Sequence, residues 1–494
     1  MRAALSCHDV VIVGAGLSGI AMAWHHRRAR PDDDLVIAEA RSSVGGTWDL
    51  FRYPGIRSDS DMATLGFTFK PWLGRKAITD GESIRHYLEA TTAEHGIAER
   101  IVFGRRLVSA DFVTADNRWK LTFQLETGDK EIRFSRFLML CTGYYNYASG
   151  YLPAFPQIER FSGLVIQPQH WPQDLSLRDK RVVLIGSGAT AVTLLPELAK
   201  EAAKVTMIQR TPTYIIEAPA IDRWSQRFIR WTGARAGHWL TRWKNILYTM
   251  GIFQLSRRWP TFVRRAIAKQ TREQLGDTLD WRKHFTPPYN PWAQRLCVAP
   301  DGDFFEPLRT GKAEMCTGTI ASFSPRHVHM ASGERIDADI VVAATGLRIL
   351  VAGGATLSVD GVELLPNALT TYKGAMLSGV PNLVMTLGYT NASWTLKSEL
   401  ICKWSVRLLN FMQRRGLQRV TPADKSAGEG QPLIDLESGY IRRAEAEMPR
   451  QTAERPWRVN QNYFLDLKAF RWSRIDDGHL QFKGEETSVS ASLD

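Results

Sequence analysis

Two regions of the chain share one order of apolar and polar positions: an apolar run, a glycine turn, a helical pattern and a second apolar run. In the first region, the apolar run Asp9–Val13 meets glycines at 14, 16 and 19, and apolar residues then recur at helical spacing to about Arg28. The second run, Leu35–Ala38, ends in Glu39. This order predicts strand, tight turn, helix and strand, the first half of a dinucleotide-binding fold.

The residue types at these positions suit a dinucleotide. Glycines let the backbone approach a pyrophosphate at the helix N-terminus, and a carboxylate after the second strand accepts hydrogen bonds from ribose hydroxyls. A glycine-rich turn without a ligand is the alternative, but the complete strand-turn-helix-strand context favours binding. The candidate contacts in this region are Gly14, Gly16, Gly19 and Glu39.

The same order returns after residue 178. It predicts a strand at Asp179–Ile185, a helix to about Lys200 and a further strand at Val205–Ile208, which is followed by an arginine where the first region has a carboxylate. A guanidinium suits a 2′-phosphate, whereas an acid repels one, so this region is predicted to bind NADPH. A solvated arginine at a strand end is the alternative. The candidate contacts are Gly186, Gly188, Ala191, Arg210 and Thr211.

Two strand-like runs, Phe137–Cys141 and Asp339–Ala344, each precede Thr-Gly and bracket the second region. The simplest topology is a first domain interrupted by a second, with the two crossings as a hinge. The predicted fold class is therefore α/β, with two Rossmann-like dinucleotide-binding domains and a helical insertion in the second. The predicted boundaries are 1–146 and 346–484 for the first domain, 147–215 and 295–345 for the second, 216–294 for the insertion, and 485–494 for a flexible tail.

The predicted insertion has an unusual composition. From Arg223 to Arg272 it carries twelve basic residues and no acid, as many charges as the net +12 of the whole chain, together with five tryptophans. One interpretation places the tryptophans in a core and the arginines in water, and another makes the segment a face that binds an anionic membrane surface. Nucleic acid is disfavoured because no nucleic-acid-binding module accompanies the charge.

Composition narrows the class of protein. The 494 residues, 44% hydrophobic and 23% charged, indicate a large globular chain, and no apolar run approaches the ~20 residues of a spanning helix. The five cysteines form no CxxC pair and no cluster with histidine, so neither a disulfide framework nor a metal site is expected. The start lacks the long apolar region of a signal peptide, which predicts a cytoplasmic protein with at most peripheral contact with the inner face of the membrane.

Two dinucleotide sites in one chain imply transfer between two cofactors. A tightly held flavin and a visiting nicotinamide are the economical pair, with FAD in the first region and NADPH in the second. A disulfide reductase needs a redox cysteine pair beside its flavin, and no two cysteines here are close in sequence. Molecular oxygen is therefore the expected acceptor.

Several separated motifs carry a resemblance. Residues 45–48 read GGTW, residues 53–55 read YPG, and Phe161–Pro172 follows the pattern FxGxxxHxxxWP with Gln167 at the histidine position. In this order, with both glycine turns, the chain resembles the class B flavin monooxygenases of the Baeyer–Villiger type, over nearly its whole length and within a subgroup that includes an ethionamide-activating monooxygenase. Glutamine cannot carry a proton, so a titrating role at Gln167 is in doubt.

The resemblance also implies roles for single residues. Arg295 aligns with the arginine that faces the flavin and stabilises negative charge on oxygen there, and Asp59 aligns with the carboxylate that orients it. Gly46 and Trp48 belong to the flavin site, although Trp48 could equally be core. Where the family often has a lysine before the arginine, this chain has glutamine at 294, so Arg210 and Thr211 would carry more of the 2′-phosphate discrimination.

The implied activity is insertion of one oxygen atom from O2 next to a ketone carbonyl, giving an ester or lactone, with sulfoxidation as a side activity. The expected partners are a small apolar ketone or sulfide, O2 and an anionic membrane surface, with no nucleic acid. One alternative is an N- or S-oxygenating flavin monooxygenase with little ketone activity. Another is a membrane-associated, NADPH-binding flavoprotein that acts as a sensor or an uncoupled oxidase. The sequence leaves the substrate itself open.

Overall fold

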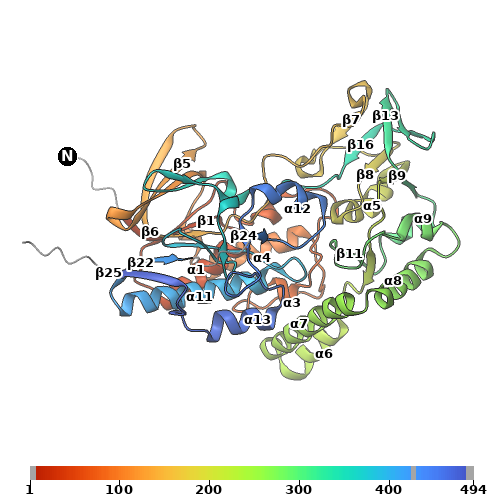
Figure 1. Cartoon of the computed structure of the whole chain (residues 1–494). Coiled ribbons are helices and arrows are strands. Elements are labelled where there is room, and N and C mark those ends of the chain that lie inside the picture. Colours follow the sequence, from red (N-terminus) through yellow and green to blue (C-terminus); the bar gives the residue numbers. More distant parts are fainter. Residues whose placement is uncertain (1–6, 424–429, 485–494) are drawn as a thin grey trace, which may run out of the picture.

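The computed structural model describes residues 7–423 and 430–484. Figure 1 shows two lobes, each built around a sheet, with an arm of long helices below the second lobe. The predicted tail at 485–494 and the first six residues lie outside the described residues.

The first lobe contains a nine-stranded sheet. Its strands run in the order β18-β17-β4-β5-β6-β1-β2-β3, and β21 also pairs with β6. The strands β6, β1, β2 and β3 pair in parallel, and β1 and β2 are rich in buried aliphatic residues, as expected of strands inside a parallel sheet. The strands are β1 Cys7–Val13, β2 Leu35–Ala38, β3 Ile101–Val102, β4 Arg105–Val113, β5 Arg118–Leu125, β6 Lys130–Leu140, β17 Thr356–Val359, β18 Val362–Leu364 and β21 Leu383–Met385.

Two helices that are distant in sequence pack together on this sheet. Helix α1, Leu17–Ala29, begins directly after the first glycine turn and contacts α11, Trp394–Arg414. Helix α4, Gly81–Glu94, packs beside α1 and has an N-terminal cap from Asp80, whose carboxylate accepts from the Ser83 backbone N–H. The first lobe therefore needs both ends of the chain.

The second lobe contains a five-stranded parallel sheet of order β12-β9-β8-β16-β7. Its strands are β7 Leu164–Ile166, β8 Arg181–Ile185, β9 Lys204–Gln209, β12 Ala313–Thr317 and β16 Ile340–Ala343, and helix α5, Ala189–Glu201, follows the second glycine turn. A small antiparallel sheet extends this lobe, with β13 Ile320–Ser324, β14 His327–Met330 and β15 Arg335–Asp337. Both glycine turns thus lie between a strand and a helix, as predicted, and the mixed α/β architecture agrees with the predicted fold class.

After β16 the chain returns to the first sheet, where β17 pairs with β4 and β21 pairs with β6. The chain therefore leaves the first sheet, forms the second and comes back to the first. The boundaries at 146, 215, 294, 345 and 484 stay predictions.

The arm consists of helices, as the sequence predicted. Helix α6 begins after Asp222, whose carboxylate accepts from the backbone N–H groups of Trp224 and Ser225, and Gly233 with φ 81° makes the turn into α7. The helices are α6 Arg223–Thr232, α7 Ala234–Arg258, α8 Pro260–Leu275 and α9 Trp281–Phe285. At the base of the arm, β10 Ile215–Ala218 pairs with β11 Cys297–Pro300.

The interpretation that places the tryptophans of the arm in a core is wrong. Exposed fractions are 52% for Trp224, 63% for Trp231 and 59% for both Trp239 and Trp259. Only Trp243 packs against the core of the first lobe. Conversely, Arg242 is buried rather than in water. The docked side of α7 combines polar residues such as Arg242 with the buried Ile246 and Met250, and Trp239, Leu247 and Tyr248 lie on its exposed side.

The remaining elements are short and lie outside the two main sheets. They are α2 Thr47–Leu50, α3 Met62–Leu65, α10 Phe305–Arg309, α12 Gly439–Ala444, α13 Tyr463–Leu467, the π-helical turn η8 Lys468–Trp472, β19 Thr371–Tyr372, β20 Met376–Leu377, β22 Leu417–Pro422, β23 Gln431–Pro432, β24 Arg450–Gln451 and β25 Leu480–Gly484. Within 7–423 and 430–484, no helix is long and apolar enough to cross a membrane.

Candidate active site

A cavity of about 440 Å³ extends from the first glycine turn to the junction of the two lobes. Of the predicted site residues, the cavity is lined by Gly14, Gly16, Glu39, Gly46, Trp48, Asp59 and Arg295. Gly19 and the predicted contacts of the second region do not line it, but Ala189 and Thr190 of the second glycine turn do. The structure therefore brings the predicted flavin contacts and the predicted arginine and carboxylate into one space.

The first glycine turn has no room for side chains. Gly14 has a φ of +104°, and a Cβ there would lie 2.6 Å from the carbonyl oxygen of Cys141. A Cβ on Gly19 would lie 1.8 Å from the Gly14 oxygen. Helix α1 begins at this turn without a side-chain cap, so its N-terminal N–H groups are available to an anion. The turn fits the pyrophosphate of a dinucleotide.

Glu39 holds this turn in place. Its carboxylate accepts a 2.6 Å hydrogen bond from the Ala15 N–H and a 2.9 Å bond from the Arg41 N–H. Burial raises the pKa of Glu39, and these two bonds counteract that rise. A carboxylate has about four acceptor positions, so capacity remains for ribose hydroxyls at the cavity wall.

The GGTW segment forms the next part of the wall. Gly46 has a φ of 55°, and a Cβ there would lie 3.2 Å from the Gly16 Cα, so the two glycine segments touch. Trp48 lines the cavity and also packs against the hydrophobic core of the first lobe. Both interpretations of Trp48, as a wall of the site and as core, hold together.

Arg295 and Asp59, 236 positions apart in sequence, both face the cavity. No ion pair within 4.0 Å joins them in the part of the chain that the structure describes, so they interact through their field rather than by direct contact. Burial raises the pKa of Asp59, although the charges of Arg295 and Arg57 oppose that rise. Burial lowers the pKa of Arg295, but the charge of Asp59 raises it above its ordinary value. A permanent cation is therefore kept inside the cavity.

Sequence reasoning missed two parts of this wall. Arg57 lies beside Asp59, and its guanidinium is held by the carboxylate of Asp303. Tyr144 and Tyr145 also line the cavity, and burial raises the pKa of Tyr144 well above its ordinary value, so its phenol stays protonated. The run YYNY at 144–147, which follows a predicted strand end, was the signal available in the sequence.

The second glycine turn lies at the same junction, and its residues Ala189 and Thr190 form part of the cavity wall. Gly186 has a φ of +135°, and a Cβ there would lie 2.3 Å from the Ala344 oxygen. A Cβ on Gly188 would meet nothing within 4 Å, which leaves space in front of the turn. Ala191 is fully buried against the sheet, and Arg210 is exposed beside Thr211.

Gln167 lies where the two lobes meet. It lines a narrow cavity together with Tyr53 of the first lobe segment and Leu347 of the returning chain. Two residues further on, the Gln169 side chain donates to the Asn146 oxygen at 2.8 Å. The segment Phe161–Pro172 therefore holds the connection between the two lobes by hydrogen bonding, without a titratable side chain at position 167.

Comparisons with known proteins agree with this geometry. Residues 12–75 match the family described as NAD(P)-binding Rossmann-like domain, and residues 78–227 match the family described as Flavin-binding monooxygenase-like. Over 486 residues, 98% of this chain and 99% of the relative, the chain is 46% identical to the FAD-containing monooxygenase EthA of Mycolicibacterium smegmatis. The chain belongs to the family of FAD-containing monooxygenases.

Solved structures share the fold of this FAD-containing monooxygenase. An oxidized steroid monooxygenase bound to NADP gives a TM-score of 0.76 at 20% identity, over 97% of this chain and 100% of the other. A cyclohexanone monooxygenase bound to ε-caprolactone gives a TM-score of 0.74 at 20% identity over the same shares. The relatives confirm the predicted family and enzyme class, the solved structures confirm the predicted fold class, and the predicted cofactors, FAD and NADPH, agree with these findings.

Proposed function

We propose that this FAD-containing monooxygenase uses NADPH and O2 to insert one oxygen atom next to the carbonyl of a small apolar ketone, giving an ester or lactone. The observation that carries the proposal is the cation of Arg295 in an aromatic-lined cavity that also holds the first glycine turn. The fold shared with a steroid monooxygenase and a cyclohexanone monooxygenase supports it.

The first glycine turn, Glu39 and Gly46 would hold FAD along the cavity. When bound, the flavin supplies hydride acceptance and the reaction with O2. Arg295 stabilises negative charge that develops on oxygen, and it cannot donate its proton because its pKa lies above the ordinary value. The charges of Asp59 and Arg57 act on that guanidinium, and the side chains of Tyr144 and Tyr145 help to exclude water from the cavity.

The test of this proposal is product identity. Purified holoenzyme is incubated with NADPH, 18O2 and a panel of ketones and sulfides, and products are analysed by mass spectrometry. An ester or lactone carrying one labelled oxygen supports the proposal, with a labelled sulfoxide as the expected side product. Sulfoxide or N-oxide without ester indicates the N- or S-oxygenating alternative, which the loss of a titratable group at Gln167 favours. Peroxide equal to the NADPH consumed, without oxygenated product, indicates the sensor or uncoupled oxidase.

Arg210 gives a separate prediction. We expect Arg210→Ala to raise the KM for NADPH at least about tenfold and to change the KM for NADH little, because only the 2′-phosphate loses a charged hydrogen-bond partner. Steady-state kinetics with both nucleotides measures this. Equal increases for NADPH and NADH would reject Arg210 as a phosphate ligand.

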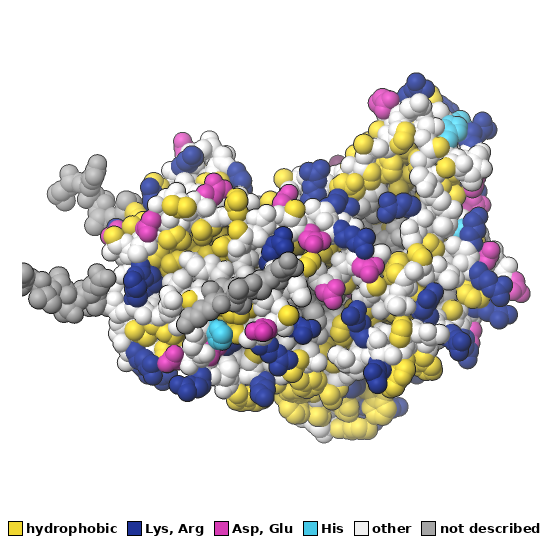
Figure 2. Space-filling model, in the orientation of Figure 1, with side chains coloured by type: hydrophobic (Ala, Val, Ile, Leu, Met, Phe, Trp, Pro, Cys, Tyr) yellow, Lys and Arg dark blue, Asp and Glu magenta, His cyan; other side chains and the backbone are white. Residues whose placement is uncertain are grey.

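We also propose that the arm rests on an anionic membrane surface, where apolar substrates concentrate, and that the protein is otherwise cytoplasmic. Figure 2 shows hydrophobic side chains gathered at the bottom of the molecule, over α6 and α7. The exposed apolar side chains of this region are Trp224, Trp231, Trp239, Leu247 and Tyr248, and α13 and η8 add Phe464, Leu465 and Trp472.

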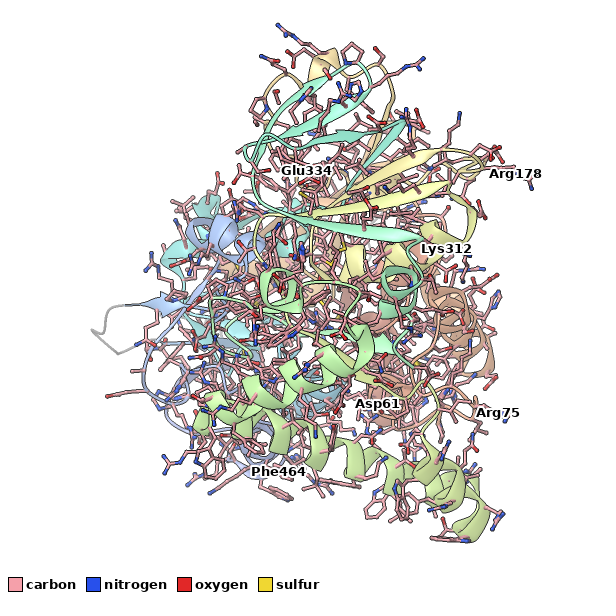
Figure 3. The ribbon with its side chains drawn as sticks, turned by 90° about the vertical axis from the view of Figure 1, so that its right-hand side faces the viewer. Asp61, Arg75, Arg178, Lys312, Glu334 and Phe464 are labelled. Carbon is pink, nitrogen blue, oxygen red and sulfur yellow. The ribbon has the colours of Figure 1, made fainter. Side chains whose placement is uncertain are left out.

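The exposed apolar side chains of the arm and those of α13 and η8 form one face. The rings of Trp239 and Trp243 lie 6.1 Å apart, and Trp243 stacks at 6.4 Å on Phe464, which Figure 3 shows beside the arm. Of the twelve basic residues from Arg223 to Arg272, only Arg242, Lys244 and Lys269 make ion pairs with described residues. Exposed tryptophans beside unpaired cations suit the interface of an anionic bilayer.

Liposome co-sedimentation tests this face. We expect binding to vesicles of phosphatidylglycerol and phosphatidylcholine, weakened by salt, and none to pure phosphatidylcholine. Reversing Arg227 and Arg230 to glutamate removes at least about 2 kcal/mol of attraction, so binding should weaken about 30-fold or more. Charge reversal of Lys312 and Arg326, exposed on the second lobe, is the matched control. Absence of binding to anionic vesicles at low salt would leave the arm as a structural insertion.

A further inference from the structure

Three arginines meet at the carboxyl edge of the second sheet. In the second sheet, the strands β9, β8 and β16 are neighbours and run parallel, so the residues that follow these strands lie at one edge of the sheet. Arg210 follows β9, the second glycine turn follows β8, and Arg348 lies in the loop after β16. The close approach of Gly186 to Ala344 and the 3.1 Å hydrogen bond from Ser187 to the Thr211 oxygen show how tightly this edge is built.

The third arginine, Arg443, lies in α12, in the segment of the chain that returns to the first lobe after β16. Arg443 of α12 donates to the Leu347 oxygen at 3.4 Å, and its guanidinium lies 3.5 Å from the ring centroid of Tyr151. A Cβ on Gly346 would lie 3.4 Å from its Nη2, so the guanidinium lies directly over the loop after β16. In Figure 2, Lys and Arg side chains surround the hollow between the lobes, beside α12.

The charges of this cluster are not balanced. Burial lowers the pKa of Arg443, and the charges of Arg348 and Arg210 lower it further, so the three guanidiniums repel one another. Among the described residues, none of the three makes an ion pair with a carboxylate. Like charges held together next to a glycine turn with open space in front form a favourable site for an anion, which offsets their repulsion.

We propose that Arg348 and Arg443 join Arg210 in binding the 2′-phosphate of NADPH, and so set its preference over NADH. The proposal rests on the proposed use of NADPH. It explains how the chain manages without a lysine at position 294: the segment before α12 packs against that loop, where the Glu437 N–H donates to the Ala293 oxygen at 2.8 Å. Arg443 therefore reaches the phosphate from the returning part of the chain, and the nucleotide is gripped from two segments.

Isothermal titration calorimetry of the FAD-loaded protein tests this without turnover. The ligands are NADP+, NAD+, adenosine 2′,5′-bisphosphate, 5′-AMP and inorganic phosphate. We expect Arg443→Gln and Arg348→Gln each to weaken NADP+ and the bisphosphate about tenfold or more, because a hydrogen bond to a charged group is lost, and to change NAD+ and 5′-AMP less than twofold. Arg442→Gln is the matched control, since Arg442 is exposed on the same helix and faces Glu437 at 3.7 Å.

Each other result has one meaning. Equal weakening of NADP+ and NAD+ would assign the arginines a structural role and overturn the proposal. Unchanged NADP+ binding in both variants, with loss in Arg210→Gln, would overturn it and leave the proposed use of NADPH intact. A wild-type protein without preference for NADP+ would overturn the use of NADPH itself. Inorganic phosphate bound as tightly as the bisphosphate would show a general anion site and would overturn the proposal. Arg443→Lys, which keeps the charge, should retain part of the NADP+ affinity if Arg443→Gln fails to fold.

Discussion

Arg295→Ala should lower ester formation at least about 10²-fold while FAD binding and reduction by NADPH persist. The reason is that only the oxygen-transfer steps develop negative charge beside this guanidinium, and loss of one such stabilising group has an effect of this size. Stopped-flow reduction of the flavin under anaerobic conditions and product formation in air measure the two parts separately.

Two variants sharpen this prediction. Arg295→Lys keeps a cation but loses the planar fork, so we expect activity between wild type and alanine. Asp59→Asn removes the charge that raises the pKa of Arg295, and it should lower product formation more than flavin reduction. Ester formation at the wild-type rate in Arg295→Ala would show that the cation has no part in oxygen transfer.

The second large effect concerns stability. Arg242 of α7 is buried, and its guanidinium donates at 2.8 Å to the oxygens of both Ala63 and Gly66 and pairs at 3.1 Å with Glu399 of α11. Arg242→Met leaves the buried Glu399 carboxylate without its cation, which costs about 3–5 kcal/mol. We expect a clear drop in the thermal midpoint followed by flavin fluorescence.

Exposed Arg235 on the same helix gives the control, because Arg235→Met should leave the midpoint nearly unchanged. The double variant Arg242→Met with Glu399→Gln removes both charges and should recover part of the loss. If Arg242→Met unfolds at the wild-type temperature, the buried pair does not hold the arm.

The same pair predicts a pH dependence. Burial alone would raise the pKa of Glu399. The His25 imidazole at 3.5 Å and the charge of Arg242 outweigh burial, so the pKa of Glu399 falls from an ordinary value of 4.5 to about 2. A carboxylate with a lowered pKa in the folded state stabilises the protein above pH 4.5, and this stabilisation is lost as the pH falls toward 2. The difference in thermal midpoint between wild type and Glu399→Gln should therefore shrink between pH 4.5 and pH 2. A constant difference would exclude titration of Glu399.

Local patterns predicted the parts of the fold that depend on local residues. The run Leu35–Ala38 is the second strand with the predicted bounds, and both glycine turns lie between strand and helix. The site around Asp59 and Arg295 came from the resemblance rather than from spacing, since nothing local connects residues so far apart. The tyrosines at 144 and 145 were missed because the run YYNY after the predicted strand was not used as a signal of a site.

The arm shows why charge along a sequence does not fix position in space. Arg242 looked like one more member of a solvated basic run, but its acid, Glu399, lies 157 positions away. Conversely, Trp239 and Trp259 suit a core by residue type, but they are exposed because the arm docks through other residues, among them Ile246 and Ile267. Only the tertiary contacts decide which face of an amphipathic helix is buried.

The return of the chain to its first sheet sets an order of events during synthesis. The five strands of the second sheet are complete once Ile340–Ala343 has left the ribosome, whereas the first sheet still waits for Thr356–Val359 and Leu383–Met385. Domains fold as units while the chain emerges, so the lobe that starts later can finish first. Because Tyr389 and Trp394 also line the cavity, the pocket for the flavin closes only near the end of translation.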